Sequence, residues 1–164
     1  MKNKVIISKI KTLNELKEVG RIVIESFASE IHSHIPELEN GGDVENVIKF
    51  VKRYTSRIKS KVPFIIYIAE LNEQIIGIAG GKLGTQPYAT DELWGCEDFW
   101  YVKKEHRGGR AGILLFNKLI KWFKDNGAKR IQMTHYTWNP KVAQFYAKKG
   151  FKPFEINYVY KVGE

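Results

Sequence analysis

The sequence predicts an α/β protein with one mixed central sheet of about six to seven strands, flanked by about four helices. Three observations point to this class. Short apolar runs such as residues 64–69 are typical of buried strands, and apolar residues recur elsewhere at helical spacing. In the second half of the chain the two kinds of segment alternate, as in an α/β domain. A chain of 164 residues suffices for one domain with a real core, so we expect a single domain over residues 1–164.

The first half of the chain begins with a predicted strand over residues 5–10. Thr12 is then expected to cap a helix, because Glu15 follows three residues later and completes a capping box. Residues 29–42 contain two histidines, a proline and a glycine pair, and are interpreted as a mobile loop or a short irregular helix. Asp43 is expected to cap the next helix, which must end before Pro63.

The second half carries the remaining predicted elements, which are bounded by turn residues and by changes in apolar period. They are strands at 64–69, 74–79, 94–102 and 130–136, a loop at 85–92, a helix from the glycine turn to Asn126-Gly127, a helix at 140–148, and a last strand region at 151–162.

Composition narrows the possible functions and locations. The N-terminus turns polar too soon for a signal peptide, no apolar run is long enough to span a membrane, and the one cysteine, Cys96, cannot form an internal disulfide. We therefore expect a cytoplasmic protein with no membrane association. The formal net charge of +9 favours polyanionic ligands in general. Nucleic acid is a possible partner, but no nucleic-acid-binding motif indicates it.

A glycine-rich turn follows the apolar strand that ends at Val102. The turn is Arg107-Gly108-Gly109-Arg110-Ala111-Gly112, and residues at helical spacing come directly after it. The first amides of a helix have no partner inside the helix, and the helix dipole adds positive charge there. Glycines let the backbone approach an anion closely. The arrangement therefore predicts a phosphate-binding turn, although neither GxxxxGK[ST] nor GxGxxG is present.

This turn resembles the acetyl-coenzyme A loop of the GNAT superfamily of N-acetyltransferases, usually written [QR]-x-x-G-x-[GA]. It starts five residues after Val102, which is the family's spacing, and Arg110 stands where the family usually has its middle glycine. A second resemblance lies at residues 139–151, which are similar to N-x-x-A-x-x-[FL]-Y-x-x-x-G-F through Asn139, Phe145, Tyr146, Gly150 and Phe151.

The resemblance implies a fold in which two central parallel strands splay apart where acetyl-coenzyme A (acetyl-CoA) enters. It implies that the backbone at Val102 pairs with the pantetheine arm, that Asn139 also contacts this arm, and that the turn binds the phosphates. The residues of the turn are Arg107, Gly108, Gly109, Arg110, Ala111 and Gly112.

The resemblance also implies catalytic roles. It puts the Tyr146 hydroxyl beside the coenzyme A sulfur as a general acid, and the backbone amide of Trp100 at the oxyanion. An amine with a pKa of about 10.4 must lose a proton before it attacks a thioester, so a base is needed. Glu97 and Asp98 are both candidates, and strand alternation lets only one face the substrate. We favour Asp98, because it lies an even number of residues before Val102 and so belongs to the same face of the strand. Glu97 or a water relay remains an alternative.

The expected function is transfer of an acetyl group from acetyl-CoA to a primary amine, by direct attack in a ternary complex, with a small molecule or a protein as acceptor. The alternative is a non-catalytic acyl-CoA-binding module, or a nucleic-acid or protein interaction module, on the same fold. His32 and His34 have no further ligand cluster, so no metal is expected. A homodimer is possible, because the last strand region is rich in aromatic residues.

Overall fold

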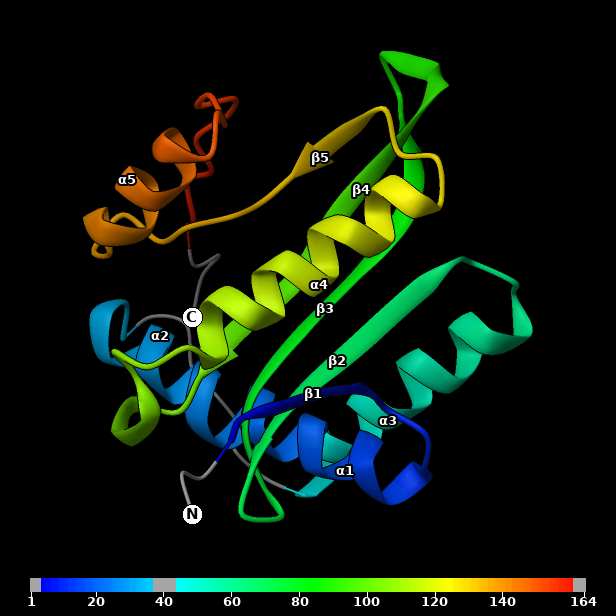
Figure 1. Ribbon diagram of the computed structural model, residues 1–164. Coiled ribbons are helices and arrows are strands. Elements are labelled where there is room, and N and C mark those ends of the chain that lie inside the picture. The colour runs from blue at the N-terminus through cyan, green and yellow to red at the C-terminus, as the bar shows by residue number, and fades with distance from the viewer. Residues whose placement is uncertain (1–3, 37–43, 161–164) are drawn as a thin grey trace.

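The computed structural model describes residues 4–36 and 44–160, which form an α/β domain around one mixed sheet (Figure 1). In these residues the sheet has the strand order β1-β2-β3-β4-β5. Neighbouring strands are antiparallel except for the parallel pair β4 and β5. The strands are β1 (Ile6–Lys9), β2 (Phe64–Leu71), β3 (Gln74–Gln86), β4 (Ala89–Val102) and β5 (Arg130–Gln132).

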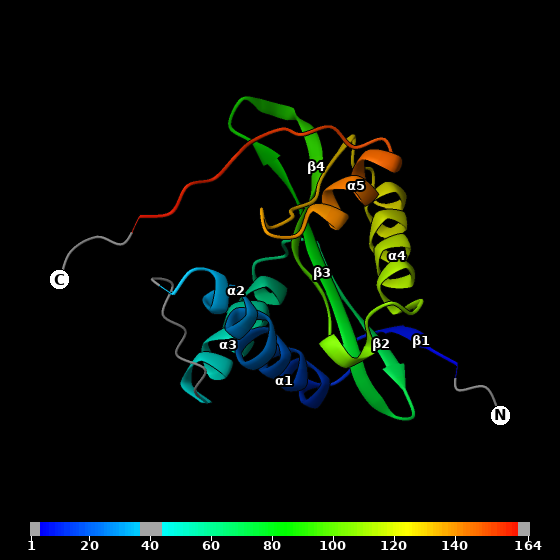
Figure 2. The ribbon, with the colours of Figure 1, turned by 90° about the vertical axis from the view of Figure 1, so that its left-hand side faces the viewer.

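Four helical segments cover the two faces of this sheet. The first is continuous and consists of α1 (Leu13–Arg21), a π-helical stretch η1 (Ile22–Phe27) and α2 (Ala28–His34). The others are α3 (Val44–Lys59), α4 (Ala111–Asp125) and α5 (Pro140–Lys148), and a single 3-10 turn, η2 (Lys104–His106), precedes α4. Figure 2 shows α1–α3 on one side of the sheet, and α4 and α5 on the other.

The predicted capping box at the start of α1 is confirmed. The Thr12 hydroxyl accepts from the Glu15 amide at 3.1 Å, and the Glu15 carboxylate accepts from the Thr12 amide at 2.7 Å. Two cores then fix the layers. Leu115, Leu119 and Phe123 of α4 pack on one face of β2 and β3, while α1 and α3 enclose Ile66, Ile68, Ile78 and Phe99 on the other.

Helix α4 packs closely on the sheet because Phe123, its last buried side chain, lies directly against two glycines of the strands, Gly81 and Gly95. A Cβ atom added at Gly81 would lie 2.5 Å from Phe123 Cζ, and one added at Gly95 would also overlap the Phe123 ring. Phe123 is fully buried. The glycines of β3 and β4 therefore set the distance between helix and sheet.

We expect Gly95→Ala to destabilise the fold by about 1–3 kcal/mol, because the added methyl overpacks a full core. Urea unfolding followed by circular dichroism would measure the change. Gly84→Ala is the matched control, since a Cβ atom there meets no atom within 4 Å. Equal free energies of unfolding for the two variants would contradict this account of the packing.

Four predictions about the elements were wrong. The described residues form five strands, where six to seven were predicted. Residues 151–160 are not a strand, because they form no strand pairing with β5 at the edge of the sheet. β5 ends at Gln132, before residue 136. The loop predicted at 85–92 is a tight turn at Pro87-Tyr88, since β3 and β4 run on as a polar hairpin. The predicted cap Asp43 lies outside the described residues.

Within residues 4–36 and 44–160, no helix is long and apolar enough to cross a membrane.

Candidate active site

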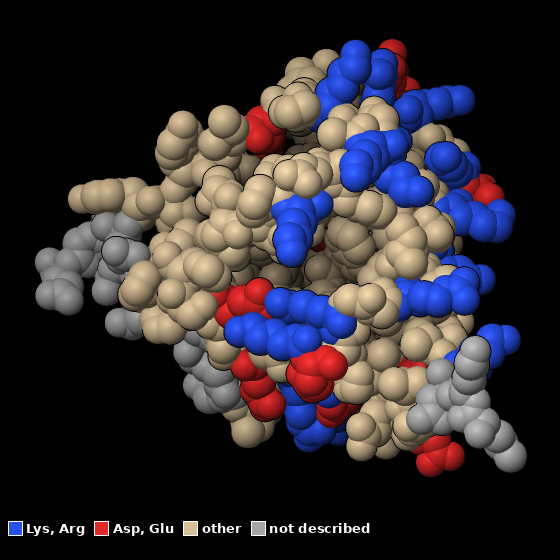
Figure 3. All heavy atoms as spheres, turned by 60° about the vertical axis from the view of Figure 1, so that its left-hand side comes forward, with Lys and Arg blue, Asp and Glu red and all other residues tan. Residues whose placement is uncertain are grey.

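A cleft opens where the two parallel strands part. β4 and β5 pair only from Trp94–Arg130 to Cys96–Gln132. Beyond this point the rest of β4 and the chain at 134–139 line opposite sides of a cavity of about 320 Å³. Figure 3 shows the molecule hollowed near the centre of this face, with cationic side chains on the rim. The separation leaves one edge of β4 free to bind an extended ligand.

The free edge of β4 carries specific backbone groups. The Lys103 amide donates to the Ile76 carbonyl at 2.9 Å, and Val102 lies opposite Gly77. Val102 is therefore at a non-hydrogen-bonded position of the antiparallel pair, where a residue turns its own amide and carbonyl away from the neighbouring strand. Trp100 lies two residues earlier in the same register, opposite Ala79. The backbone amides of Trp100 and Val102 therefore point towards the cleft.

The glycine-rich turn leads directly into α4. Gly108 has a φ angle of +81°, a conformation that side chains rarely adopt, and a Cβ atom there would meet no atom within 4 Å. Arg110 stands at the N-cap with a φ angle of −85°, which any residue can adopt. No side chain caps the helix. The first amides of α4 therefore remain available to an anion.

Arg107 joins the turn to both sides of the cleft. Its Nε donates to the Val102 carbonyl at 2.9 Å, and its two terminal nitrogens donate to the Glu30 carboxylate of α2 at 3.1 and 2.6 Å. The bond from Arg107 lowers the pKa of Glu30 from its ordinary value. This guanidinium is thus occupied by the protein itself, while Arg110 lies exposed at the helix N-terminus.

A β-bulge in β4 decides which carboxylate faces α4 and α5. The register moves from Gly80–Phe99 to Gly81–Glu97, so that Asp98 is the extra residue. A bulge reverses the alternation of the residues before it relative to those after it. Asp98 consequently shares the α3 face of the sheet with Phe99, and Glu97 shares the α4 and α5 face with Trp100. Strict alternation from Val102 back along the strand would have put Asp98 on the face of Trp100, and the sequence does not reveal the bulge that puts Glu97 there instead.

Glu97 lines the cleft and belongs to a small polar network with Thr134 and the buried Tyr146. Its carboxylate accepts from the Thr134 amide at 3.0 Å, and the Tyr146 hydroxyl donates to the Thr134 carbonyl at 3.1 Å. The pKa of Glu97 is raised to about 7, chiefly by burial and also by the charge of Asp98, although the hydrogen bonds from Thr134 and Tyr146 lower it. Burial and the Glu97 charge also raise the pKa of Tyr146. At neutral pH the site thus holds a protonated phenol beside a carboxyl group whose pKa lies well above that of an ordinary glutamate.

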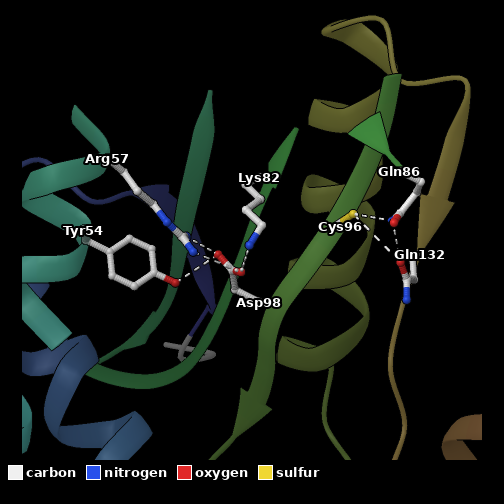
Figure 4. Close-up of polar contacts among 7 residues, drawn as sticks. All are labelled: Tyr54, Arg57, Lys82, Gln86, Cys96, Asp98 and Gln132. Carbon is white, nitrogen blue, oxygen red and sulfur yellow. Dashed lines mark hydrogen bonds and ion pairs between the residues drawn. The ribbon is translucent and has the colours of Figure 1, made fainter. Parts of the chain in front are cut away.

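Asp98 points to the opposite side of β4, into a cluster of cations (Figure 4). It forms an ion pair with Arg57, its Oδ1 lies 3.5 Å from Lys82 Nζ, and its Oδ2 accepts from the Tyr54 hydroxyl at 3.1 Å. Its side chain is only 14% exposed. Asp98 also lines the cleft. Through Arg57 and Tyr54, Asp98 therefore holds helix α3 against strand β4 of the sheet.

We expect Asp98→Asn to lower the free energy of unfolding by about 2–3 kcal/mol, because Arg57 and Lys82 lose their shared countercharge in a part-buried setting. Urea unfolding would measure this. Glu45→Gln is the control, since it breaks an ion pair with Lys49 whose side chains are 70% and 64% exposed. A loss no larger than that of the control would contradict the structural role of Asp98.

An aromatic wall on the α2 side of the cleft was not predicted from the sequence. Phe27 stacks on Tyr101 with ring centroids 5.1 Å apart and meets the edge of Tyr136 at 5.8 Å. Trp138 stacks between Tyr136 at 4.7 Å and His34 at 4.6 Å. The sequence did contain a signal for this wall, because tyrosine, tryptophan and histidine cluster within residues 134–139. The signal was missed because residues 130–136 were interpreted as a strand.

The remaining predicted site residues lie around the same cleft. Asn139 lines it, and although Asn139 precedes α5 its side chain does not cap that helix, so the amide is not used for capping. Gly112 and Val102 also line the cleft, and the Trp100 indole donates to the Gly112 carbonyl at 3.0 Å. In the described part of the chain, no three His, Cys, Asp or Glu side chains are grouped as a metal ion would require.

Comparisons with known proteins agree on the fold. A crystal structure of a transcriptional regulator from Bacillus halodurans C-125 is 16% identical, with a TM-score of 0.75, over 96% of this chain and 99% of that one. A predicted acetyltransferase with acetyl-CoA from Clostridium acetobutylicum is 14% identical, with a TM-score of 0.68, over 97% of each chain. Glucosamine-6-phosphate N-acetyltransferase from Arabidopsis thaliana is 17% identical, with a TM-score of 0.68, over 98% of this chain and 99% of that one.

No curated protein matches the chain. The family model described as the acetyltransferase (GNAT) family matches residues 31–151, which is more than half of the sequence. This match includes the glycine-rich turn, the splayed strands and the Glu97–Thr134–Tyr146 network. The chain belongs to the GNAT family of acetyltransferases.

Proposed function

We propose that this protein is an N-acetyltransferase that transfers the acetyl group of acetyl-CoA to a primary amine by direct attack in a ternary complex. The observation that carries the proposal is the pairing of a carboxyl group of pKa about 7, Glu97, with the protonated Tyr146 hydroxyl at the splay of β4 and β5. Two titratable groups with such different proton affinities suit a reaction that removes one proton and supplies another.

Glu97 is the proposed general base, in place of Asp98. A base must be ionised at the working pH and yet hold a proton well enough to remove it from an ammonium group, which favours a pKa near 7. Asp98 is already paired with Arg57 and Lys82, and those positive charges weaken it as a base. Glu97 has no such partner among the contacts described above and faces the same side as Trp100 and Tyr146.

Tyr146 is the proposed acid for the departing thiolate, and the Trp100 amide the proposed donor to the oxyanion. The raised pKa keeps Tyr146 protonated at neutral pH, as an acid requires. The non-hydrogen-bonded register of Trp100 leaves its amide free of β3, which supports the second role. An oxyanion donor of this kind contributes about 3 kcal/mol to the transition state.

The residues of the cleft fit acetyl-CoA. The Val102 amide points to the cleft and can pair with a pantetheine amide as an added strand would, while the Val102 carbonyl already accepts from Arg107, and Asn139 lies on the opposite wall. The uncapped N-terminus of α4 suits the pyrophosphate, with the backbone of Arg107, Gly108, Gly109, Arg110, Ala111 and Gly112 as the proposed cradle. When bound, acetyl-CoA supplies the activated acetyl group.

The proposed acceptor is a small molecule with a primary amine, which reaches Glu97 past the aromatic wall. Phe27, Tyr136 and Trp138 line the cleft together with Glu97, so aromatic rings lie along the proposed path of the cationic amine. The Arabidopsis neighbour is named for acetylation of glucosamine-6-phosphate, and a further neighbour is an aminoglycoside acetyltransferase in complex with sisomicin. Acceptors in both cases are amines of modest size, consistent with the cleft.

Calorimetric titration with acetyl-CoA, followed by thiol release with a panel of amines, would test the proposal. We expect acetyl-CoA and coenzyme A to bind and ATP to bind far more weakly. We also expect thiol release to depend on the amine. Tight binding without turnover on any amine would instead favour an acyl-CoA-binding module, and absence of binding in folded protein would overturn the proposal.

A further inference from the structure

The face of the sheet that carries the Asp98 side chain holds a strip of polar residues beside the cleft. Lys82 of β3 pairs with Cys96 of β4, and Cys96 pairs with Gln132 of β5, so these three side chains share one face of the sheet. The contact between Lys82 and Asp98 identifies it as the α3 face. Gln86 joins the polar strip through its amide, which donates to Gln132 at 3.3 Å (Figure 4). Because Asp98 also lines the cleft, the polar strip reaches the cleft.

Two cations share a single carboxylate at the cleft end of the polar strip. Asp98 forms an ion pair with Arg57, and its Oδ1 lies 3.5 Å from Lys82 Nζ. Two positive charges against one negative charge leave this group with a net charge of +1. The Arg57 side chain is 15% exposed and the Lys82 side chain is 42% exposed. The uncompensated positive charge is therefore presented to solvent by Lys82.

The Lys82 ammonium group is only partly used by the fold. Its 3.5 Å contact is longer than the roughly 2.7–2.9 Å of a charge-assisted hydrogen bond, and Arg57 already holds Asp98 in place. Within residues 4–36 and 44–160, Lys82 forms no other ion pair. Glu155 lies at the far end of the polar strip, where it accepts from Gln132 two strands away from Lys82, and it is exposed. Its repulsion of an anion at Lys82 is therefore screened by solvent.

The acceptor reaches the cleft from the side of the polar strip. The proposed acetyl-CoA site lies at the N-terminus of α4 and beside Trp100, which faces α4 and α5. The cofactor fills that side when it is bound, which leaves the α3 side for the acceptor. Glu97 and Asp98 are consecutive residues, and both line the cleft. An amine at Glu97 therefore leaves the rest of the acceptor beside Asp98 and Lys82.

The positions of Glu97 and Lys82 set the size of the acceptor. Glu97 pairs with Gly81 of β3, and Lys82 is the next residue along that strand. Neighbouring strands are about 4.8 Å apart, and the two side chains leave the sheet on opposite faces. An amine at Glu97 and a group bound by Lys82 are thus separated by one to two strand spacings, which is roughly 5–10 Å. A small molecule can span this distance.

We propose that the acceptor bears both a primary amine and an anionic group, a carboxylate or a phosphate, and that Lys82 binds the anionic group while the amine lies at Glu97. This inference rests on the proposed function and specifies its substrate. A polycationic acceptor would instead meet a local excess of positive charge, in addition to the net charge of +9 of the whole chain. Lys82 is a binding residue in this proposal and takes no part in the proton transfers.

Thiol release with matched acceptors would test the proposal. Each set has one chain length and carries a primary amine at one end, with a carboxylate, a phosphate, a methyl group or a second amine at the other. We expect kcat/KM for the carboxylate or the phosphate member to exceed that for the methyl member at least about tenfold, because the anion gains a charge-assisted contact. The comparison of these two members identifies the anion. A diamine that is as good an acceptor as both would overturn the proposal.

Variants of Lys82 distinguish a local site from the overall charge of the protein. Lys82→Gln should reduce the preference for the anionic acceptor over the methyl one at least about tenfold, whereas Lys82→Arg keeps the charge and should retain most of it. Lys49→Gln is the matched control, because it removes the same charge from a side chain that is 64% exposed and pairs with Glu45 on α3. Equal losses in Lys82→Gln and Lys49→Gln would assign the preference to the net charge and overturn the proposal.

Binding without chemistry separates this inference from the proposed function. Calorimetry would titrate the anionic amines and their methyl counterpart into protein saturated with coenzyme A, which has no acetyl group to transfer. We expect an anionic amine to bind more tightly, and Lys82→Gln to abolish the difference. If no amine releases thiol but this difference is present, the proposed function fails and the anion site stands. If amines release thiol with no preference for an anion, the function stands and the anion site is overturned.

Discussion

Glu97→Gln is expected to lower kcat by about 10²–10⁴-fold while leaving the affinity for acetyl-CoA nearly unchanged. Glutamine has the same shape, and its amide oxygen can still accept from Thr134, so the network at the splay keeps its geometry. What is lost is the ability to take a proton from the incoming ammonium group. Steady-state kinetics with the best amine of the panel would measure kcat, and calorimetry would measure the binding of acetyl-CoA.

The pH dependence gives this prediction a second readout. Glu97 acts as a base only when it is ionised, and its pKa is about 7. The kcat of the unaltered protein should therefore rise with pH through a limb near 7 and level off above it. In Glu97→Gln the limb near 7 should vanish, and any dependence that remains should follow the pKa of the amine itself.

Asp98→Asn is the matched control for catalysis, because it removes the neighbouring carboxylate on the opposite face of β4. We expect it to reduce stability and to retain the limb near pH 7, shifted slightly downward, since the charge of Asp98 raises the pKa of Glu97. If Asp98→Asn abolishes the limb and Glu97→Gln retains it, the assignment of the base must be reversed.

The orientation of Glu97 and Asp98 shows where the sequence stopped being informative. Apolar periodicity and the two GNAT-like motifs were enough to predict the α/β class, the glycine-rich turn before α4 and the helix that carries Tyr146. Which carboxylate joins Tyr146 depends on one extra residue in β4. A bulge is detected in a sequence as a break in the alternation of apolar and polar residues. Residues 99–102 are apolar on both faces of the strand, so there is no alternation for a bulge to break.

Residues 151–160 were misassigned as a strand for a related reason. Residues 154–160 alternate as a strand does, and local propensity predicts one, but a strand exists only where another backbone completes its hydrogen bonds. In the described residues β5 is three residues long, and no strand pairs with residues 151–160. Propensity thus identified a segment that can form a strand, but it could not show whether a neighbouring strand is there to pair with it.

Tyr146→Phe is expected to lower kcat by at least about 10²-fold with little change in the KM for acetyl-CoA. The ring should stay in place, because it packs against Trp100 at 5.9 Å and Phe151 at 5.5 Å, and the variant loses the hydroxyl with its bond to Thr134 and its interaction with Glu97. That bond contributes about 1 kcal/mol to stability, which the fold can sustain. A loss in kcat without a loss in binding is the signature of an interaction made in the transition state.

The leaving group distinguishes an acid from a positioning residue. If Tyr146 supplies the proton or hydrogen bond that the departing thiolate needs, acetyl donors whose thiols have a lower pKa should need it less, because such thiols leave more readily. The defect of Tyr146→Phe should then shrink as the thiol pKa falls. Tyr136→Phe, at another tyrosine of the cleft, is the matched control and should respond to the donor as the unaltered protein does. A defect that is constant across donors would assign Tyr146 to orienting Thr134 and, through it, Glu97.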